Sequence, residues 1–183
     1  MFADQALEAV CNLWEFDSVL DIGSGGGDHC RHFRNLNKSV TTISLEPPAD
    51  IIGDYLLTDI EQHDLVWASH VLEHQPNVNL FLKKCFVDCR KYFCVTVPPM
   101  KHEIVGGHVS LWNGGLLLYN MILAGWDCKR AKVMSYGYNI SVLVEKCEAR
   151  LPPLRMDSGD INRLARFFPM AVQDGFDGKM WEW

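Results

Sequence analysis

The sequence predicts a single α/β domain in which helices cover both faces of a mostly parallel sheet. Residues 19–22 read as the end of an apolar strand that runs into a glycine turn and then a polar, helix-compatible segment. Residues 64–68, DLVWA, are apolar almost throughout, which is typical of a buried parallel strand. Residues 128–146 alternate around a glycine as a pair of strands. Strand, glycine turn and helix form the entry to a nucleotide-binding α/β unit.

Length, charge and cysteine usage narrow the choice of function. The 183 residues suffice for one domain with a sizeable core. The net charge is −6 and no run of lysine or arginine stands out, so binding to nucleic acid is not expected. No apolar run approaches the roughly 18 residues of a membrane span, and the first residues lack a secretory signal pattern, so no membrane contact is expected. Seven scattered cysteines without a C-x-x-C pair indicate reduced thiols in a cytoplasmic protein.

The glycine turn defines the first candidate site, since glycines let the backbone approach a ligand and the next helix offers free N–H groups. Glycines at positions 23, 25 and 27, followed by aspartate, fit the dinucleotide pattern G-x-G-x-x-G poorly but fit D-x-G-x-G-x-G well. This run resembles motif I of class I S-adenosylmethionine-dependent methyltransferases. The resemblance implies that the acid lies beneath the methionine part of the cofactor and that the loop passes its amino and carboxylate groups. The candidate cofactor-binding residues here are Asp21, Gly23, Ser24 and Gly25.

Two acids after the next strands are further cofactor candidates. Residues 40–45, VTTISL, read as the second strand, which ends at Glu46 before two prolines. An acid there, about twenty residues after the glycine turn, can accept hydrogen bonds from both ribose hydroxyls. A short third strand ends in Asp54, for which the resemblance implies a contact with the adenine amino group; Asp59 is the second choice.

The strand at 64–68 leads directly into SHVLEH, residues 69–74, at the edge where open α/β sheets bind ligands. Strand and loop together resemble the signature of small class I methyltransferases, and the whole resemblance covers residues 17–99. It implies cofactor contacts from Ser69 and His70.

Two metal hypotheses compete at this loop. HVLEH matches the inverzincin pattern H-x-x-E-H, but that motif needs a long helix for its ligands and here it follows a buried strand. Some metal-dependent O-methyltransferases have a similar Glu–His pair preceded by an acid, and His102 or His108 could complete such a shell. Because this sequence has His70 in place of that acid, we predict no metal site and interpret Glu73 as a helix-start acid.

Further helices are expected at residues 2–14, at residues 77–89 and at residues 116–123. The buried stripe of the second would consist of Leu80, Phe81, Leu82, Cys85 and Phe86. The fifth strand, residues 92–97, is followed by an aperiodic segment on the ligand side, where loops carry substrate specificity. The candidate substrate-binding residues are His102, His108, Trp112 and Tyr119.

The hairpin around Gly137 would supply the antiparallel last strands of a seven-stranded sheet, whose order 3-2-1-4-5-7-6 is implied by the resemblance. We assign residues 1–150 to the cofactor-binding domain and residues 151–183 to a tail with a short helix, packed on the same domain. Aromatic side chains of the tail could pack on the core, cover the active site or contact a second subunit in a homodimer. They are Phe176, Trp181 and Trp183.

The predicted activity is methyl transfer from S-adenosyl-L-methionine to an oxygen or nitrogen of a small molecule. The protein's main task would be to align nucleophile and methyl group. A hydroxyl or amine acceptor would also need a base, for which His70, His74 and His108 are the candidates, whereas a carboxylate would need none. The alternatives are an NAD(P)-dependent oxidoreductase, which would need another parallel crossover, and a non-catalytic S-adenosylmethionine-binding module.

Overall fold

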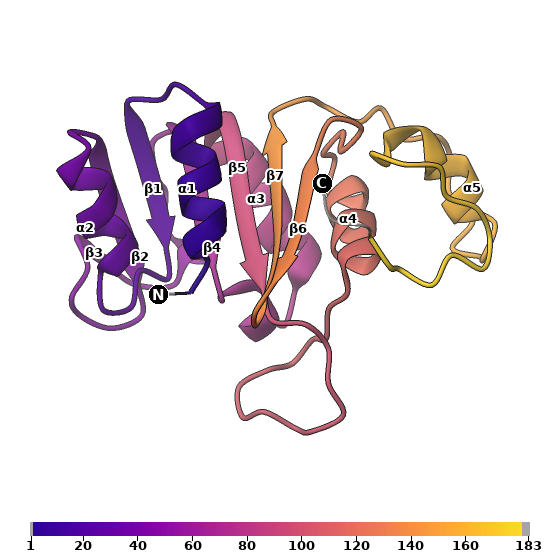
Figure 1. The fold of residues 1–183 in the computed structure, drawn as a ribbon, viewed down its shortest axis with the longest axis horizontal. Coiled ribbons are helices and arrows are strands. Elements are labelled where there is room, and N and C mark those ends of the chain that lie inside the picture. Colours follow the sequence, from indigo (N-terminus) through magenta and orange to yellow (C-terminus); the bar gives the residue numbers. More distant parts are fainter. Residues whose placement is uncertain (1, 181–183) are drawn as a thin grey trace.

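The computed structural model describes residues 2–180 and contains a seven-stranded sheet in the order β3-β2-β1-β4-β5-β7-β6 (Figure 1). Its strands are β1 (Ser18–Ile22), β2 (Ser39–Ser44), β3 (Ile51–Ile52), β4 (His63–Ser69), β5 (Cys89–Val97), β6 (Lys132–Tyr136) and β7 (Asn139–Glu145). Strands β1 to β5 pair in parallel, whereas β7 is antiparallel to both of its neighbours. The predicted fold class and strand order are confirmed, and the antiparallel β7 does not favour the oxidoreductase.

Helices cover both faces of the sheet (Figure 1). They are α1 (Asp4–Leu13), α2 (Asp28–Asn35), α3 (Val78–Asp88), α4 (Gly114–Leu123) and α5 (Asp160–Leu164), with 3₁₀ helices η1 (Tyr55–Leu57), η2 (Leu72–His74) and η3 (Ala165–Phe167). On one face, Leu7 of α1 and Phe33 of α2 pack with Trp67 of β4. On the other face, α3 and α4 contribute to the larger core cluster, which includes Phe81 and Phe93. In residues 2–180, no helix is both long enough and apolar enough to cross a bilayer.

The predicted buried stripe on α3 is wrong at one residue, Leu80. Leu80 is 54% exposed, whereas Phe81, Leu82 and Cys85 are buried. A helix turns by about 100° per residue, so the buried residues share one face and Leu80 lies beyond its edge. The helix therefore packs on the sheet through a narrower stripe than its apolar sequence predicts.

The segment after residue 150 packs beside α4. Leu164, Phe167 and Phe168 belong to the core cluster that α4 also joins, and Phe176 packs against that cluster. The backbone N–H of Gly115 donates to the carbonyl of Gly178 at 2.9 Å. The other two aromatic residues assigned to this contact by sequence, Trp181 and Trp183, lie outside the described residues.

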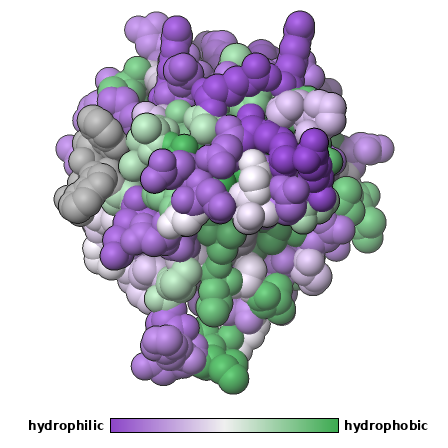
Figure 2. Space-filling view, turned by 90° about the vertical axis from the view of Figure 1, so that its right-hand side faces the viewer, coloured by the Kyte–Doolittle hydropathy of each residue, from purple (hydrophilic) through white to green (hydrophobic). Residues whose placement is uncertain are grey.

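The carboxyl ends of the parallel strands share one edge of the sheet, the lower edge in Figure 1. The glycine turn after β1, the residues after β2, the 3₁₀ helix η2 after β4 and the loop of residues 98–113 after β5 all emerge there. This loop hangs below the sheet in Figure 1, and the molecule narrows to a projection at its lower end in Figure 2. The fold thus gathers candidate site residues from these four segments at one edge.

Candidate cofactor and acceptor site

The glycine turn after β1 is pressed against the loop that follows β4. Gly23 has a φ of 70°, and its N–H donates to the carbonyl of Ile43 at 2.7 Å. A Cβ atom added at Gly23 would lie 2.3 Å from Cγ2 of Val71. Since both the backbone conformation and the packing exclude a side chain, this position requires glycine. The predicted turn residue Gly25 also has a positive φ, of 49°.

Buried polar atoms without partners gather where β1 and β4 end. Among the described residues, Oδ2 of Asp21, Oγ of Ser24 and Oγ of Ser69 are buried and have no hydrogen-bond partner. The two strands are neighbours, with Ile22 opposite Ala68, so these residues lie at the same edge. Buried polar groups are almost always hydrogen-bonded, and a local group of exceptions indicates a site for polar ligand atoms.

The pKa of the Asp21 carboxyl group depends on its burial and on the charges beside it. Burial raises its pKa to about 7, although the backbone N–H of Cys30 and the charge of Arg34 both act to lower it. A positively charged ligand group at this position would favour the ionised form and lower the pKa again.

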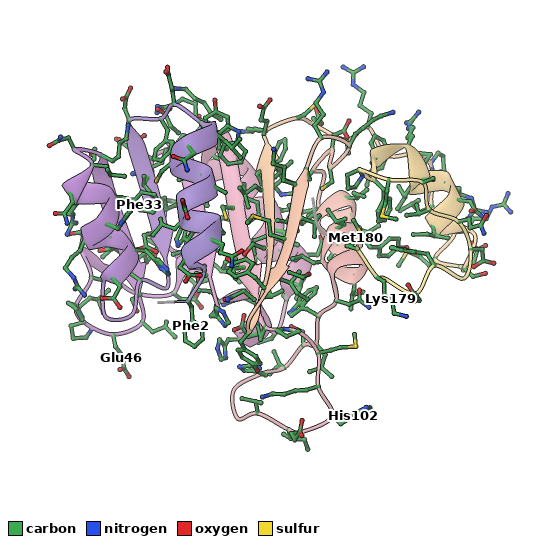
Figure 3. The ribbon with its side chains drawn as sticks, viewed as in Figure 1. Phe2, Phe33, Glu46, His102, Lys179 and Met180 are labelled. Atoms are coloured by element: carbon green, nitrogen blue, oxygen red, sulfur yellow. The ribbon has the colours of Figure 1, made fainter. Side chains whose placement is uncertain are left out.

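A pocket of about 350 Å³ lies beside the glycine turn. It is lined by Ile22, Gly23, Ile43, Ser44, Leu45, Gly53, Asp54, Tyr55, His70, Val71, His74, Gln75, Pro76 and Phe81. Of the predicted cofactor residues it contains Gly23, Asp54 and His70, and the carboxylate of Asp54 also accepts a hydrogen bond from the N–H of Leu56 at 2.8 Å. Glu46 directly follows the lining residue Leu45 but does not itself line the pocket; it is exposed, and its side chain extends downward from the lower edge of the sheet into solvent (Figure 3).

His70 is held from both sides. It has a φ of 56°, Nε2 lies 3.0 Å from Oδ1 of Asn139, and Nδ1 lies 3.3 Å from Oε1 of Glu73. The amide of Asn139 is oriented by its other bonds, since Oδ1 accepts from the N–H of Ala3 and Nδ2 donates to the carbonyl of Tyr136. Nε2 must therefore be the donor to Asn139.

The charge state of His70 follows from these contacts. Burial lowers the pKa of His70, but Glu73 and Asn139 together outweigh it and the pKa is raised. An imidazole with protons on both nitrogens has no lone pair to accept another. The geometry therefore suits His70 to holding the loop and the carboxylate better than to acting as a base.

Glu73, His74 and His108 form a second cluster. Glu73 has an exposure of 0%, and within residues 2–180 neither of its carboxylate oxygens receives a well-aligned hydrogen bond. Nε2 of His74 lies 3.8 Å from Oε1 of Glu73, and the rings of His74 and His108 are 5.0 Å apart and nearly perpendicular. One oxygen of Glu73 and one ring nitrogen of each histidine lie within 4.8 Å of one another. These residue types, at these distances, could hold a proton, a polar acceptor or a metal ion.

The long loop brings His108 to this cluster. The backbone N–H of Val109 donates to the carbonyl of Glu73 at 2.8 Å, and Nδ1 of His74 lies 2.8 Å from the carbonyl oxygen of Gly107. These two bonds join the loop to η2. His108 and His102 also line a smaller pocket of about 180 Å³, formed by the loop together with Tyr138.

The remaining predicted substrate residues do not join this cluster. His102 is exposed and extends from the loop into solvent (Figure 3). Trp112 is only 2% exposed and closes the base of the loop, where its carbonyl accepts from the N–H of Met100 at 2.7 Å. Tyr119 lines a depression between α4 and the tail that shares no lining residue with the two pockets described above.

Sequence reasoning missed one residue of this site and set another aside. Asn139 was read as part of a strand, although an amide in the apolar run YNISVLV is a signal that could have identified it. A shell of Glu73 and His74 completed by His102 or His108 was considered, but Glu73 was interpreted as a helix-start acid; its side chain lies between three histidines. The spacing of residues along the chain does not choose between His102 and His108, because both lie in an irregular loop.

No protein-family model matches this chain, and no curated protein matches it. Solved structures do resemble it. A 1,6-didemethyltoxoflavin-N1-methyltransferase of Burkholderia thailandensis, with bound 1,6-didemethyltoxoflavin and S-adenosylhomocysteine, has a TM-score of 0.64 and 16% identity over 79% of this chain and 78% of that one. A SAM-dependent methyltransferase of Aquifex aeolicus has a TM-score of 0.63 and 13% identity over 80% and 90%.

Human N-acetylserotonin methyltransferase in complex with SAM has a TM-score of 0.61 and 14% identity over 76% of this chain and 51% of the human enzyme, so the chain spans about half of that protein. At such identities the likeness concerns the fold. The chain has the Rossmann-like fold of class I S-adenosylmethionine-dependent methyltransferases.

Proposed function

We propose that this chain binds S-adenosyl-L-methionine and transfers its methyl group to an oxygen or nitrogen atom of a small molecule. The observation that carries the proposal is the group of unpartnered polar atoms on Asp21, Ser24 and Ser69 in the described part of the chain. Hydroxyl groups can donate to the carboxylate of the cofactor, and a carboxylate can accept from its ammonium group. Ionised Asp21 would also be stabilised by the cofactor's positive charge.

The larger pocket has the composition that the rest of the cofactor requires. Its apolar walls include Ile43, Tyr55 and Phe81, against which an adenine ring can pack. Glu46 and Asp54 would supply acceptors for the ribose hydroxyls and the adenine amino group. The same fold is found with S-adenosylhomocysteine in the bacterial enzyme and with SAM in the human one, which supports this choice of cofactor.

The cofactor, when bound, supplies a methyl group made electrophilic by a positively charged sulfur. The chain must bring an acceptor atom into line with that group and keep water away. With its Nδ1 proton donated to the carbonyl of Gly107, a neutral His74 keeps a free lone pair on Nε2, which can take a proton from a hydroxyl or an amine. The acceptor would enter between η2 and the loop of residues 98–113, beside His108.

The test is calorimetric titration of the protein with SAM and with S-adenosylhomocysteine. We expect micromolar binding of both to the wild type and binding weakened about tenfold or more in Glu46→Ala, since a ribose contact of this kind is worth on the order of 1–3 kcal/mol. Glu61→Ala is the matched control: Glu61 is another exposed glutamate, but it precedes β4 at the opposite edge of the sheet. Absence of binding by folded wild-type protein, or equal affinities in both variants, would contradict the assigned site.

A further inference from the structure

The cluster of Glu73, His74 and His108 is centred on a buried carboxylate with spare acceptor capacity. The carboxylate of Glu73 is wholly buried, and in the described residues neither oxygen has a hydrogen-bond partner. A buried carboxylate is strongly unfavourable unless positive charge and hydrogen-bond donors lie against it. The imidazolium of His70 lies 3.3 Å from Oε1, but one contact to one of the two oxygens leaves most of the acceptor capacity of the carboxylate unused.

The tautomer of His74 adds a second unfavourable contact at the carboxylate of Glu73. A carbonyl oxygen can only accept, so the ring nitrogen Nδ1, 2.8 Å from the carbonyl of Gly107, must carry a proton. In the neutral ring, Nε2 then directs a lone pair towards Oε1 of Glu73, 3.8 Å away. Two acceptors that face each other repel, and a cation between them turns the repulsion into attraction. A histidine that donates its second ring nitrogen to a backbone carbonyl is also the usual arrangement of a metal ligand.

We propose that Glu73, His74 and His108 bind a divalent transition-metal ion of the zinc type. One carboxylate oxygen and two ring nitrogens, all within 4.8 Å of one another, converge from η2 and from the loop of residues 98–113. Two histidines and a glutamate form one of the ligand sets of catalytic zinc, in which a further position stays open. Two imidazole ligands favour zinc, cobalt or iron over magnesium and calcium, which prefer oxygen.

The surroundings decide which positions are ligands. His70 is excluded as a ligand because Nε2 is committed to Asn139 and Nδ1 faces Glu73, so it orients the carboxylate instead. The side chain of His74 is 43% exposed and His108 is half-buried, so the open side of the cluster faces solvent. An acceptor molecule could therefore reach the ion without displacing a protein ligand.

The position of this cluster suggests the chemical class of the acceptor, an inference that rests on the proposed function. His74 lines the larger pocket and His108 lines the smaller one, so the ion would lie between the two pockets. With the ion bound, the Nε2 lone pair of His74 would bind the metal and could not also accept a proton, so the ion would replace His74 in activating the acceptor. An ion of this kind binds oxygen and lowers the pKa of a bound hydroxyl group. The acceptor of this chain would accordingly be a small molecule that presents a hydroxyl group to the metal.

The test is metal binding by untagged protein that has been freed of metal with a chelator. Titration with Co²⁺ and Zn²⁺ should give one equivalent bound with micromolar affinity or better. Bound Co²⁺ should absorb visible light more strongly than the hydrated ion, as it does at a low coordination number. His108→Ala should weaken binding at least tenfold. His102→Ala is the matched control, because His102 belongs to the same loop and the same small pocket but not to the cluster.

Two results would overturn the proposal: no Co²⁺ or Zn²⁺ bound by folded wild-type protein, or equal affinities in the His102 and His108 variants. Glu73→Gln should also lose the ion; should this buried variant fail to fold, the two loop variants, His102→Ala and His108→Ala, still decide. S-adenosylhomocysteine titration of the metal-free protein separates the two proposals. Cofactor binding without metal binding refutes only the metal site, and metal binding without cofactor binding refutes only the proposed function.

Discussion

The two halves of the candidate site are built in different ways. The cofactor half consists of short turns between parallel strands, and its backbone is constrained by contacts such as that between Gly23 and Val71. The acceptor half is the loop of residues 98–113, whose outer part is exposed: Ile104 has 98% of its surface in solvent. This loop is secured at its base by the bridge between Pro99 and Trp112, and at η2 by the bond from Val109 to Glu73 and the bond from His74 to Gly107. A substitution should therefore affect stability and cofactor affinity together in the first half, and neither of them in the outer part of the loop.

The largest effect is expected at Gly23. In Gly23→Ala the new methyl group would overlap Val71 and the backbone would keep a positive φ, so the free energy of unfolding should fall by roughly 2–4 kcal/mol. S-adenosylhomocysteine binding should be lost. Urea denaturation and calorimetric titration measure the two effects.

Gly26→Ala is the control in the same turn. Among the described atoms nothing lies within 4 Å of a Cβ at Gly26, and we expect a change within about 0.5 kcal/mol. Equal losses in both variants would show that the turn does not depend on the contact with Val71.

Asp21→Asn should change both stability and cofactor binding, but in opposite directions. Burial raises the pKa of Asp21 to about 7. In the unfolded chain this carboxyl ionises near its ordinary value of 3.8, so between these two pH values the folded state binds more protons than the unfolded state. The contribution of Asp21 to the stability of the wild type should therefore fall as the pH rises from about 4 to about 7 and stay level above.

The asparagine variant avoids this loss. At pH 8 it should be more stable than the wild type by roughly 1–3 kcal/mol, and it should bind SAM at least tenfold more weakly. Thermal denaturation between pH 4 and pH 8 and titration with SAM measure these quantities. If the variant were less stable than the wild type at pH 8, burial of the ionised Asp21 carboxylate would not be destabilising and the prediction would be wrong.

The smallest effect is expected in the loop. Ile104→Ala should change the free energy of unfolding by less than about 0.5 kcal/mol and leave cofactor affinity unchanged, because the side chain is exposed. Ile43→Ala, the same substitution at a buried residue of the cofactor pocket, should cost roughly 2–4 kcal/mol. A stability loss in the Ile104 variant would mean that the loop tip packs more tightly than its exposure indicates.

The sequence predicted the first half of the site far better than the second. The glycine turn after β1, the apolar strand β4 and the antiparallel hairpin at the end of the sheet all follow from local patterns, and each lies where it was expected. Residues of the acceptor half, in the loop and in α4, could be proposed only by their chemical type. His108 reaches the ligand edge, whereas Trp112 closes the loop base and Tyr119 lies against the tail, and nothing in their spacing separates these outcomes.

By itself, the sequence determined the order of strands and helices, the turn that requires glycine and the edge at which the site forms, because these depend on short-range periodicity and on the common direction of parallel strands. Only the tertiary structure decided that Asn139 orients His70 and that His108 meets Glu73 and His74. These contacts join β4, β7 and the long loop. Their geometry depends on how separate segments pack, and periodicity within one segment carries no information about that.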